Sequence, residues 1–199
     1  MSHQFPEVWL DTTTVLYRVH REHREPEHFG TSGDMRFDPP LSHRTRFGTC
    51  YVAEIELACV LEVFGSIGVI SQTELDIRRT TTLQVAHRTR LADLTARSIL
   101  GQFRLDGSLH TGMDRTATQQ FAAERHEEGF DGILYKIRHD PALRLAGIAL
   151  FGEPGTQRQM FTAAKTRMID SEALTAMQDE FSIEVRSPLA LPVWDERLR

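Results

Sequence analysis

The chain has 199 residues, of which 40% are hydrophobic and 26% are charged, and its formal net charge at pH 7 is -5. These values are ordinary for a globular protein, so they exclude a disordered or fibrous chain, and we expect one domain with one substantial core. The acidic balance gives no general attraction to polyanions, although local arginine clusters can still bind phosphates. We therefore expect no direct nucleic-acid binding and no membrane association.

The first third of the chain alternates between strand-like and loop-like sequence. Val15 to Val19 has β-branched and aromatic residues with polar residues between them, which predicts a strand. Arg21 to Phe47 is rich in His, Arg, Gly and Pro and predicts an extended loop. Thr49 to Ala53 predicts a second short strand. Ile55 to Phe64 predicts a helix that is too apolar all round to lie exposed on the surface.

The middle of the chain favours helices. Thr80 to Ala86 is a further predicted strand, and the apolar residues from Leu91 to Phe103 are roughly helically spaced. Arg115 to Glu128 predicts a clearer helix, with Gly129 as its stop. The apolar segment from Gly132 to Ile137 then predicts a strand.

The last part of the chain returns to strands. After a turn at Asp140 and Pro141, the segment AGIALFG predicts another strand. Ser171 can cap a short helix that runs through Asp179, and Phe181 to Val185 predicts a last strand before the tail SPLALPVWDERLR. Helices and strands are mixed without a regular alternating repeat, so the sequence predicts an α+β fold.

Two cysteines, Cys50 and Cys59, both lie within apolar sequence. With no wider cysteine framework, they indicate small buried thiols in a reducing compartment. The amino terminus lacks the basic start and apolar segment of a secretory signal, and no run approaches the roughly 18 apolar residues of a membrane span. We therefore expect a soluble, cytoplasmic protein.

Familiar site motifs are absent from the sequence. It has no glycine fingerprint of a dinucleotide-binding Rossmann turn and no phosphate-binding loop ending in Gly, Lys and Ser or Thr. His20, His23 and His28 lie close together, but their spacing does not place two ligands on one helical face. A solvated histidine-rich loop is favoured over a metal site, and we expect no metal.

Glu62 stands out within the predicted apolar helix. The 3.6-residue repeat places it between Ile55, Ala58 and Cys59 around the helix, which is no obvious solvent face. Carboxylates are almost never fully buried unless they are paired. Glu62 is therefore expected either at the mouth of a pocket or near a helix end that reaches solvent.

Several separated segments together resemble the RES domain, a family named for its Arg, Glu and Ser residues. They are Arg18 in LYRVH, Arg36 in GDMRFDPP, Tyr51 in CYVA, Glu62 in ACVLEVFG, and the segments GFDGILYKIRHDP and ALFG. The resemblance covers Val15 to Gly152 and implies an ADP-ribosyltransferase-like fold. It further implies that residues 1–199 form a single RES-like domain, with a matched core at about 15–152 and a helix, strand and tail at 153–199.

The resemblance also implies an activity and a partner. RES proteins are NAD-consuming toxins, usually encoded beside an Xre-like antitoxin that blocks them. NAD would therefore be a substrate of this chain, cleaved at the bond between nicotinamide and ribose. Such cleavage builds positive, oxocarbenium-like charge on the ribose, which a carboxylate stabilises.

The matched residues receive roles from this resemblance. Glu62 would hydrogen-bond the ribose and stabilise its developing charge, and Tyr51 would offer its ring to nicotinamide and its hydroxyl to a ribose or phosphate. Arg18 and Arg36 would bind the pyrophosphate. The alternatives are core packing for Tyr51 and solvated surface charge for the two arginines.

One matched segment departs from the family pattern. In ILYKIRHDP, Ile137 stands where the family has the Ser of its name, and an isoleucine side chain makes no hydrogen bond. Arg138 could compensate only if it faced the pocket, which strand alternation disfavours. The loop that contains Arg44 and Arg46 is long for the pattern and could reshape the entrance.

Three functions remain open from the sequence. The first is an enzyme that cleaves NAD and passes ADP-ribose to water, phosphate or a protein side chain. The second is a RES-like protein that has lost catalysis with the Ser and retains a nucleotide pocket or a partner surface. The third is a scaffold with merely solvated charges, for which Arg36, Tyr51 and Glu62 would not converge in one cleft.

Overall fold

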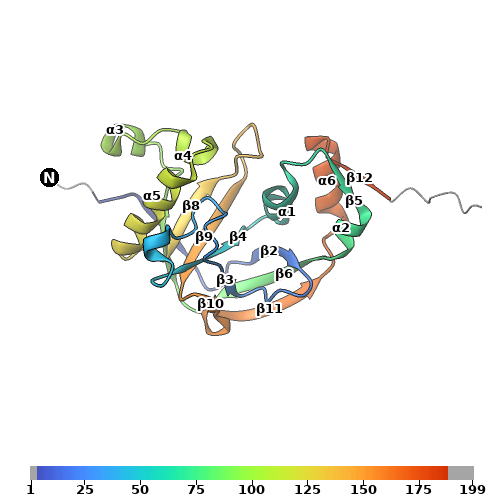
Figure 1. The fold of residues 1–199 in the computed structure, drawn as a ribbon, viewed down its shortest axis with the longest axis horizontal. Coiled ribbons are helices and arrows are strands. Elements are labelled where there is room, and N and C mark those ends of the chain that lie inside the picture. The colour runs from blue at the N-terminus through green and yellow to red at the C-terminus, as the bar shows by residue number, and fades with distance from the viewer. Residues whose placement is uncertain (1–3, 188–199) are drawn as a thin grey trace, which may run out of the picture.

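The structure is a computed structural model that describes residues 4–187, and it has the mixed α+β architecture expected from the sequence (Figure 1). The strands are β1 (Glu7–Leu10), β2 (Leu16–Arg21), β3 (His28–Phe29), β4 (Gly48–Val52), β5 (Val69–Ser71), β6 (Arg78–Val85), β7 (Thr89–Asp93), β8 (Gly132–Lys136), β9 (Ala146–Gly152), β10 (Gly155–Thr156), β11 (Phe161–Arg167) and β12 (Glu184–Arg186). The α-helices are α1 (Glu56–Phe64), α2 (Gln72–Asp76), α3 (Ile99–Phe103), α4 (Ser108–Thr111), α5 (Arg115–Glu127) and α6 (Ser171–Phe181).

Two sheets carry most of the strands. The larger has five strands in the order β1-β7-β8-β9-β4, in which β7 and β8 are parallel and the other neighbours are antiparallel. The smaller has three antiparallel strands in the order β11-β6-β2. An isolated bridge between Tyr17 and Ala53 links the smaller sheet to the end of β4. Two short pairs, β10 with β3 and β12 with β5, complete the strands.

The two faces of the five-stranded sheet contribute to different parts of the core, because successive strand residues point to opposite faces. Cys50 and Val52 of β4 pack with residues of β2 and β6 from the smaller sheet. Tyr51, which lies between them, packs instead into the cluster that contains buried residues of α1 and α5. Tyr135 of β8 belongs to the same helix-covered cluster. The topology therefore directs two tyrosines toward α1.

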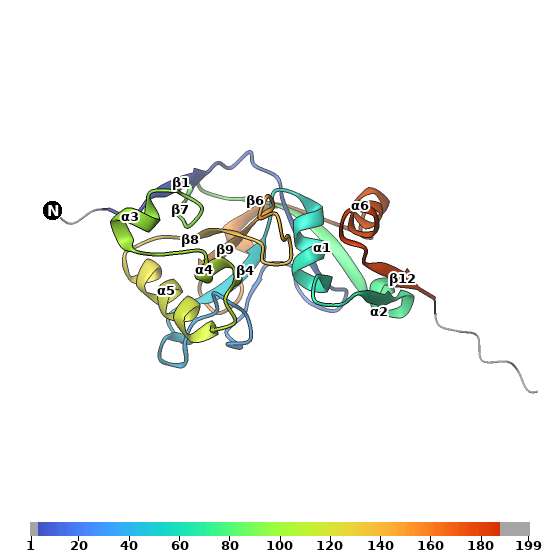
Figure 2. The same cartoon turned by 90° about the horizontal axis from the view of Figure 1, so that it is seen from above.

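Helix α1 lies in the middle of the molecule, between the five-stranded sheet and α6 (Figure 2). It begins after the extended residue Ile55 and ends at Gly65. Six of its nine residues are buried, which explains why its sequence is apolar on nearly all sides. A Cβ on Gly65 would lie 2.4 Å from the Cβ of His139, so glycine is required where this helix end meets the loop after β8.

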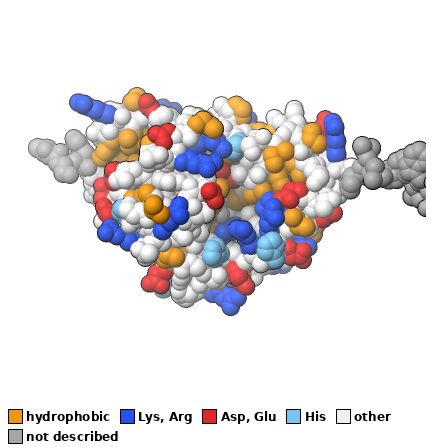
Figure 3. All heavy atoms as spheres, in the orientation of Figure 1, with side chains coloured by type: hydrophobic (Ala, Val, Ile, Leu, Met, Phe, Trp, Pro, Cys, Tyr) orange, Lys and Arg blue, Asp and Glu red, His pale blue; other side chains and the backbone are white. Residues whose placement is uncertain are grey.

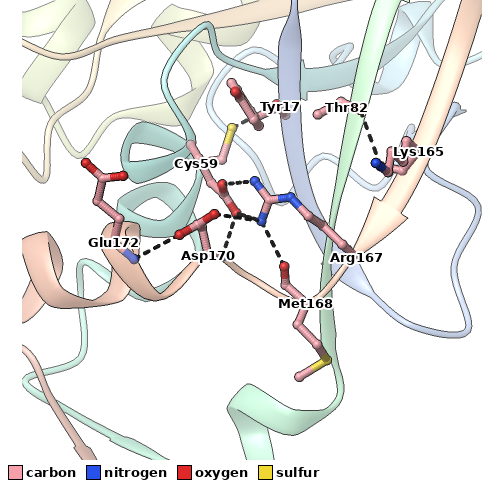
Figure 4. A network of polar contacts seen from close by, with 9 residues as sticks. Tyr17, Cys59, Thr82, Lys165, Arg167, Met168, Asp170 and Glu172 are labelled. Carbon is pink, nitrogen blue, oxygen red and sulfur yellow. Dashed lines mark hydrogen bonds and ion pairs between the residues drawn. The ribbon is translucent and has the colours of Figure 1, made fainter.

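The first turn of α1 is anchored by an ion pair from the other end of the chain. Glu56 is 8% exposed, and its carboxylate accepts hydrogen bonds from Arg167 at 3.2 and 2.5 Å and from the backbone N–H of Asp170 at 3.1 Å (Figure 4). The thiol of Cys59, one turn later, donates to the carbonyl of Tyr17 at 2.9 Å. These contacts fix the position of α1 against β2, β11 and α6.

Most of the elements expected from the sequence are present with small shifts of their ends. β2, β4, α1, β6, α5, β8 and β9 all lie where strands or helices were predicted. The segment from Arg21 to Phe47 is mainly loop, interrupted by β3 and by a short 3-10 helix at Leu41–His43. Both cysteines are buried free thiols, as predicted.

Three predictions about secondary structure were wrong. Leu91 belongs to strand β7 and not to a helix, because its segment pairs with β1 on one side and β8 on the other. The cap of α6 is Asp170, whose carboxylate accepts from the N–H of Glu172, and Ser171 is already helical. Phe181 ends α6, so the last strand begins at Glu184.

The histidine-rich segment is only partly solvated, which corrects the expectation for His20. This residue lies on β2 with 7% exposure, and its ring contacts the Thr81 hydroxyl at 2.8 Å and the Arg21 carbonyl at 2.9 Å. His23 and His28 are exposed, as expected. No helix within residues 4–187 is long and apolar enough to cross a membrane. Of the predicted tail, residues 188–199 lie outside the described part of the chain.

Candidate active site

Two adjoining pockets open beside α1, with volumes of about 460 Å³ and about 130 Å³. Four side chains line both pockets, namely Met35, Tyr51, Glu62 and Tyr135. The space-filling view shows a hollow on this face with basic side chains gathered around it (Figure 3). The shared lining places one carboxylate where the two pockets meet.

Glu62 projects from the second half of α1 and is half-buried. Its Oε1 atom accepts a hydrogen bond from the hydroxyl of Tyr135 at 3.2 Å. Burial raises the pKa of the Glu62 carboxyl, while the Tyr135 hydrogen bond and the charges of Arg36 and Arg138 act in the opposite direction. Glu62 therefore lies at a pocket wall and does not reach open solvent from a helix end.

Tyr135 was not identified as a site residue from the sequence, because it resembles a core aromatic of β8. It is 2% exposed, and burial raises the pKa of its hydroxyl well above the ordinary value. Gly147, its partner on β9, makes room for the ring, since a Cβ there would lie 2.7 Å from the phenolic oxygen. A buried tyrosine needs a partner for its hydroxyl, and here that partner is Glu62.

Arg36 and Arg138 line the smaller pocket together with Glu62. Arg36 donates through one nitrogen to the carbonyls of Leu109 at 3.2 Å and Gly112 at 3.0 Å, which holds its guanidinium in place. Burial and the neighbouring charge of Arg138 lower the pKa of Arg36. The site thus combines a half-buried carboxylate with two guanidinium groups.

The position of Arg138 corrects the expectation from strand alternation. Strand β8 ends at Lys136, so the alternation of side chains does not extend to Arg138. The Nε atom of Arg138 donates to the ring of His139 at 3.2 Å, and both residues line the smaller pocket. Arg115 and Ser66 line it as well, and neither was singled out from the sequence.

Tyr51 lines both pockets, but its hydroxyl is already engaged within the protein. It accepts from the N–H of Phe37 at 2.8 Å and donates to Asp38 at 3.2 Å. Asp38, which is 2% exposed, also accepts from Ser32, Gly33 and Met35, so it organises the loop beside the pocket. The ring of Tyr51 is therefore more available to a ligand than its hydroxyl.

Arg18 lines the larger pocket and is separate from Arg36, which lines the smaller one. One nitrogen of Arg18 donates to the carbonyls of Pro26 at 2.6 Å and His28 at 2.8 Å, and contacts the Cys50 sulfur at 2.7 Å. Arg18 thus fastens the loop between β2 and β3 to β4. Arg36, Tyr51 and Glu62 do converge on one pocket, contrary to the scaffold hypothesis.

Ile137 is 0% exposed and lines neither pocket. Its backbone N–H donates to the carbonyl of Leu145 at 3.1 Å, just beyond the end of β8. The side chain packs in the helix-covered core cluster. The Ile137 side chain, which the family resemblance places at the Ser of the family name, therefore presents no group to either pocket.

The long loop before β4 is tied to the protein surface and does not line either pocket with its arginines. Arg44 donates to the carbonyl of Ser32 at 2.8 Å, and Arg46 pairs with Glu127 of α5 at 2.9 Å. Neither arginine lines a pocket, although Arg44 holds Ser32, which lines the larger one. Among residues 4–187, no group of three or more His, Cys, Asp or Glu side chains is placed to hold a metal ion.

Comparison with known proteins agrees with the fold. The sequence matches the RES domain over residues 15–169. The structure is similar to a chain in the crystal structure of the M. tuberculosis MbcT-MbcA toxin-antitoxin complex, with a TM-score of 0.59 and 18% sequence identity, over 87% of this chain and 91% of that chain. No functionally curated protein matches the sequence at a significant level.

Proposed function

The chain belongs to the RES domain family, and from that premise we propose that it consumes NAD by cleaving the bond between nicotinamide and ribose. The observation that carries the proposal is the position of Glu62. Its carboxylate lies where two pockets meet, bonded to Tyr135 at 3.2 Å and acted on by the charges of Arg36 and Arg138. A partly buried carboxylate with a free face toward a cavity suits the stabilisation of a cation.

The proposed reaction breaks the bond between the anomeric carbon of ribose and the ring nitrogen of nicotinamide. The bonding electrons pass to that nitrogen, which loses its positive charge, while positive charge develops on the ribose. The carboxylate of Glu62 stabilises this charge by electrostatic attraction and by a hydrogen bond to a ribose hydroxyl. Water, phosphate or a protein side chain then bonds to the anomeric carbon as the acceptor.

The other predicted residues have supporting roles in the proposal. The ring of Tyr51 offers a flat apolar surface to nicotinamide. Arg36 contributes positive charge to the smaller pocket beside Glu62, where it favours the ionised form of that carboxylate. Arg18 lines the larger pocket and holds its wall.

An antitoxin partner is part of the same proposal. The similar M. tuberculosis structure is a toxin-antitoxin complex. The family resemblance implies that the antitoxin is Xre-like. We expect expression of this chain alone to arrest growth and co-expression of a neighbouring antitoxin gene to relieve the arrest.

The second candidate is a RES-like protein that binds a nucleotide or a partner without efficient catalysis. It is favoured by Ile137, which is 0% exposed and supplies no hydroxyl to either pocket. In this case the pockets would still bind the nucleotide. The two candidates differ in whether nicotinamide is released.

The deciding experiment measures nicotinamide release from NAD by the purified protein, in buffer with phosphate and in buffer without it. Release supports the enzyme, and the second product identifies the acceptor as water, phosphate or protein. Folded protein that binds NAD and releases no nicotinamide supports the binding candidate. Protein that neither binds nor cleaves NAD contradicts the enzyme and leaves only a RES-like protein that binds a partner.

A further inference from the structure

Five arginines line the two pockets, and within residues 4–187 none of them forms an ion pair with a carboxylate. They are Arg18, Arg24, Arg36, Arg115 and Arg138. Arginines near the same loop but outside the pockets are paired: Arg21 with Glu74 at 3.5 Å and Arg158 with Glu25 at 3.0 Å. Guanidinium groups left unpaired beside a cavity favour an anionic ligand.

Four of the five pocket arginines form two pairs, and each pair acts to lower the pKa of a different pocket residue. The charges of Arg36 and Arg138 act on Glu62 in the smaller pocket. Burial and the charges of Arg18 and Arg24 lower the pKa of His28, which lines the larger pocket with them. A basic group thus lies in the larger pocket, distinct from the one beside the carboxylate.

Arg18 is largely occupied by the protein itself, whereas Arg24 is not. Arg18 donates to the carbonyls of Pro26 and His28 at 2.6 and 2.8 Å, and so holds in place the loop that carries Arg24. Arg24 is exposed at the pocket wall, and no hydrogen bond or ion pair of its side chain occurs with residues 4–187. Its guanidinium is therefore available to a ligand.

Acidic groups in the larger pocket do not compete for Arg24. Asp38 and Glu62 are the carboxylates in its lining. Both oxygens of Asp38 already accept hydrogen bonds, from Tyr51 and from the loop at 32–35. Glu62 accepts a hydrogen bond from Tyr135 and is influenced by the charges of Arg36 and Arg138. The hydroxyls of Thr31 and Ser32 add neutral donors to the same wall.

We propose that Arg24 and His28 bind the diphosphate of the dinucleotide, with Arg18 as the positioning residue that holds their loop. This inference rests on the proposed function for the identity of the ligand. It assigns the larger pocket, of about 460 Å³, to the phosphate-bearing part of the substrate. The reacting bond then lies toward Glu62, at the junction with the smaller pocket.

The test is isothermal titration of ADP-ribose, which carries the diphosphate and lacks nicotinamide, into the parent protein and two variants. Arg24→Gln should weaken binding roughly 10-fold, the value of one charge-assisted hydrogen bond. Arg21→Gln is the matched control, because Arg21 is paired with Glu74 and does not line the pocket, and it should bind like the parent. Equal affinities for Arg24→Gln and the parent, or no binding by the parent, would overturn the proposal.

Nicotinamide release from NAD by the parent protein, measured in parallel, separates this inference from the proposed function. If the parent cleaves NAD and Arg24→Gln binds ADP-ribose normally, the diphosphate site is wrong and the function stands. If the parent releases no nicotinamide and ADP-ribose binding still depends on Arg24, the function is wrong and the diphosphate site stands.

Discussion

The hydroxyl of Tyr135 donates a hydrogen bond to Glu62 across 3.2 Å, and this contact joins strand β8 to helix α1 where the two pockets meet. Each residue is 73 positions from the other in sequence, and each lies in the lining of both pockets. The contact makes Tyr135 the orienting partner of the carboxylate, since it fixes one oxygen and leaves the other for a ligand. The first three predictions concern this pair.

Replacing Glu62 by Gln should lower the rate of nicotinamide release by roughly 100-fold or more, because the change keeps the shape of the side chain and removes the charge that stabilises the transition state. The measurement is initial rate at saturating NAD, with the fold checked by circular dichroism. Glu54→Gln, at an exposed glutamate before α1, is the control. A Glu62→Gln protein as active as the parent would remove Glu62 from the mechanism.

Replacing Tyr135 by Phe should shift the acidic limb of the pH-rate profile to higher pH. Burial raises the pKa of Glu62, and the hydrogen bond from Tyr135 lowers it. Loss of this hydrogen bond should therefore raise the pKa further. Activity requires the ionised carboxylate and is lost as pH falls through its pKa. The measurement is kcat/KM as a function of pH, and a limb that stays in place or moves to lower pH contradicts the assigned contact.

Glu62 should also make the stability of the protein depend on pH. Because its pKa is raised above the ordinary 4.5, the folded protein holds this proton more tightly than the unfolded chain does. The stabilisation is fully present below the unfolded pKa and is lost as pH rises through the folded pKa. Urea unfolding should therefore show that Glu62→Gln gains stability relative to the parent as pH rises from the unfolded pKa through the folded pKa of Glu62. A difference in unfolding free energy that stays constant over this pH range would contradict the raised pKa.

Replacing Ile137 by Ser should destabilise the protein by about 3 kcal/mol, because it leaves a cavity and a buried hydroxyl in the core. Ile137 lines neither pocket, so the new hydroxyl should not raise activity. Urea unfolding measures the loss, with Ile137→Val as the matched control at about 1 kcal/mol. A stable Ser variant with faster NAD cleavage would show that the side chain reaches the ligand.

Removing the charge of Glu56 by substitution with Gln should destabilise the protein by about 1–3 kcal/mol. Its carboxylate is nearly buried while Arg167 is about one-third exposed, so the loss is smaller than for a fully buried pair. Urea unfolding compares this variant with Glu54→Gln. A change no larger than that of the control would mean that the ion pair does not hold α1.

The sequence predicted the helices and strands in which apolar residues repeat at a regular spacing. It failed for a strand that is formed only by hydrogen bonding to its neighbour. Strand β11 was missed because five of its seven residues are exposed, so its sequence carries no alternation of apolar and polar residues. Its strand structure depends on pairing with β6. Leu91 and the apolar residues after it suggested one helix, but Leu91 is a sheet residue and α3 begins only at Ile99.

The candidate site likewise contains residues that the sequence identified and residues that it missed. Glu62 was identified because a carboxylate is anomalous in an apolar helix, and Arg36 and Tyr51 were identified through the family resemblance. Tyr135 carried only a weak signal, since an aromatic residue in a strand is usually core, and only its hydroxyl indicated a need for a partner. The direction of Arg138 depended on where β8 ends, and strand ends are poorly defined by local sequence.

The ion pair between Glu56 and Arg167 also has a consequence for synthesis, because its members are 111 residues apart. Translation proceeds from the amino terminus. A nascent chain that ends before β11 therefore contains Glu62, Tyr51 and Tyr135 but lacks Arg167, the ion-pair partner that anchors α1. The helix that carries the carboxylate gains this ion pair only after Arg167 has emerged from the ribosome. The anchoring of α1 by this ion pair is therefore completed late in translation.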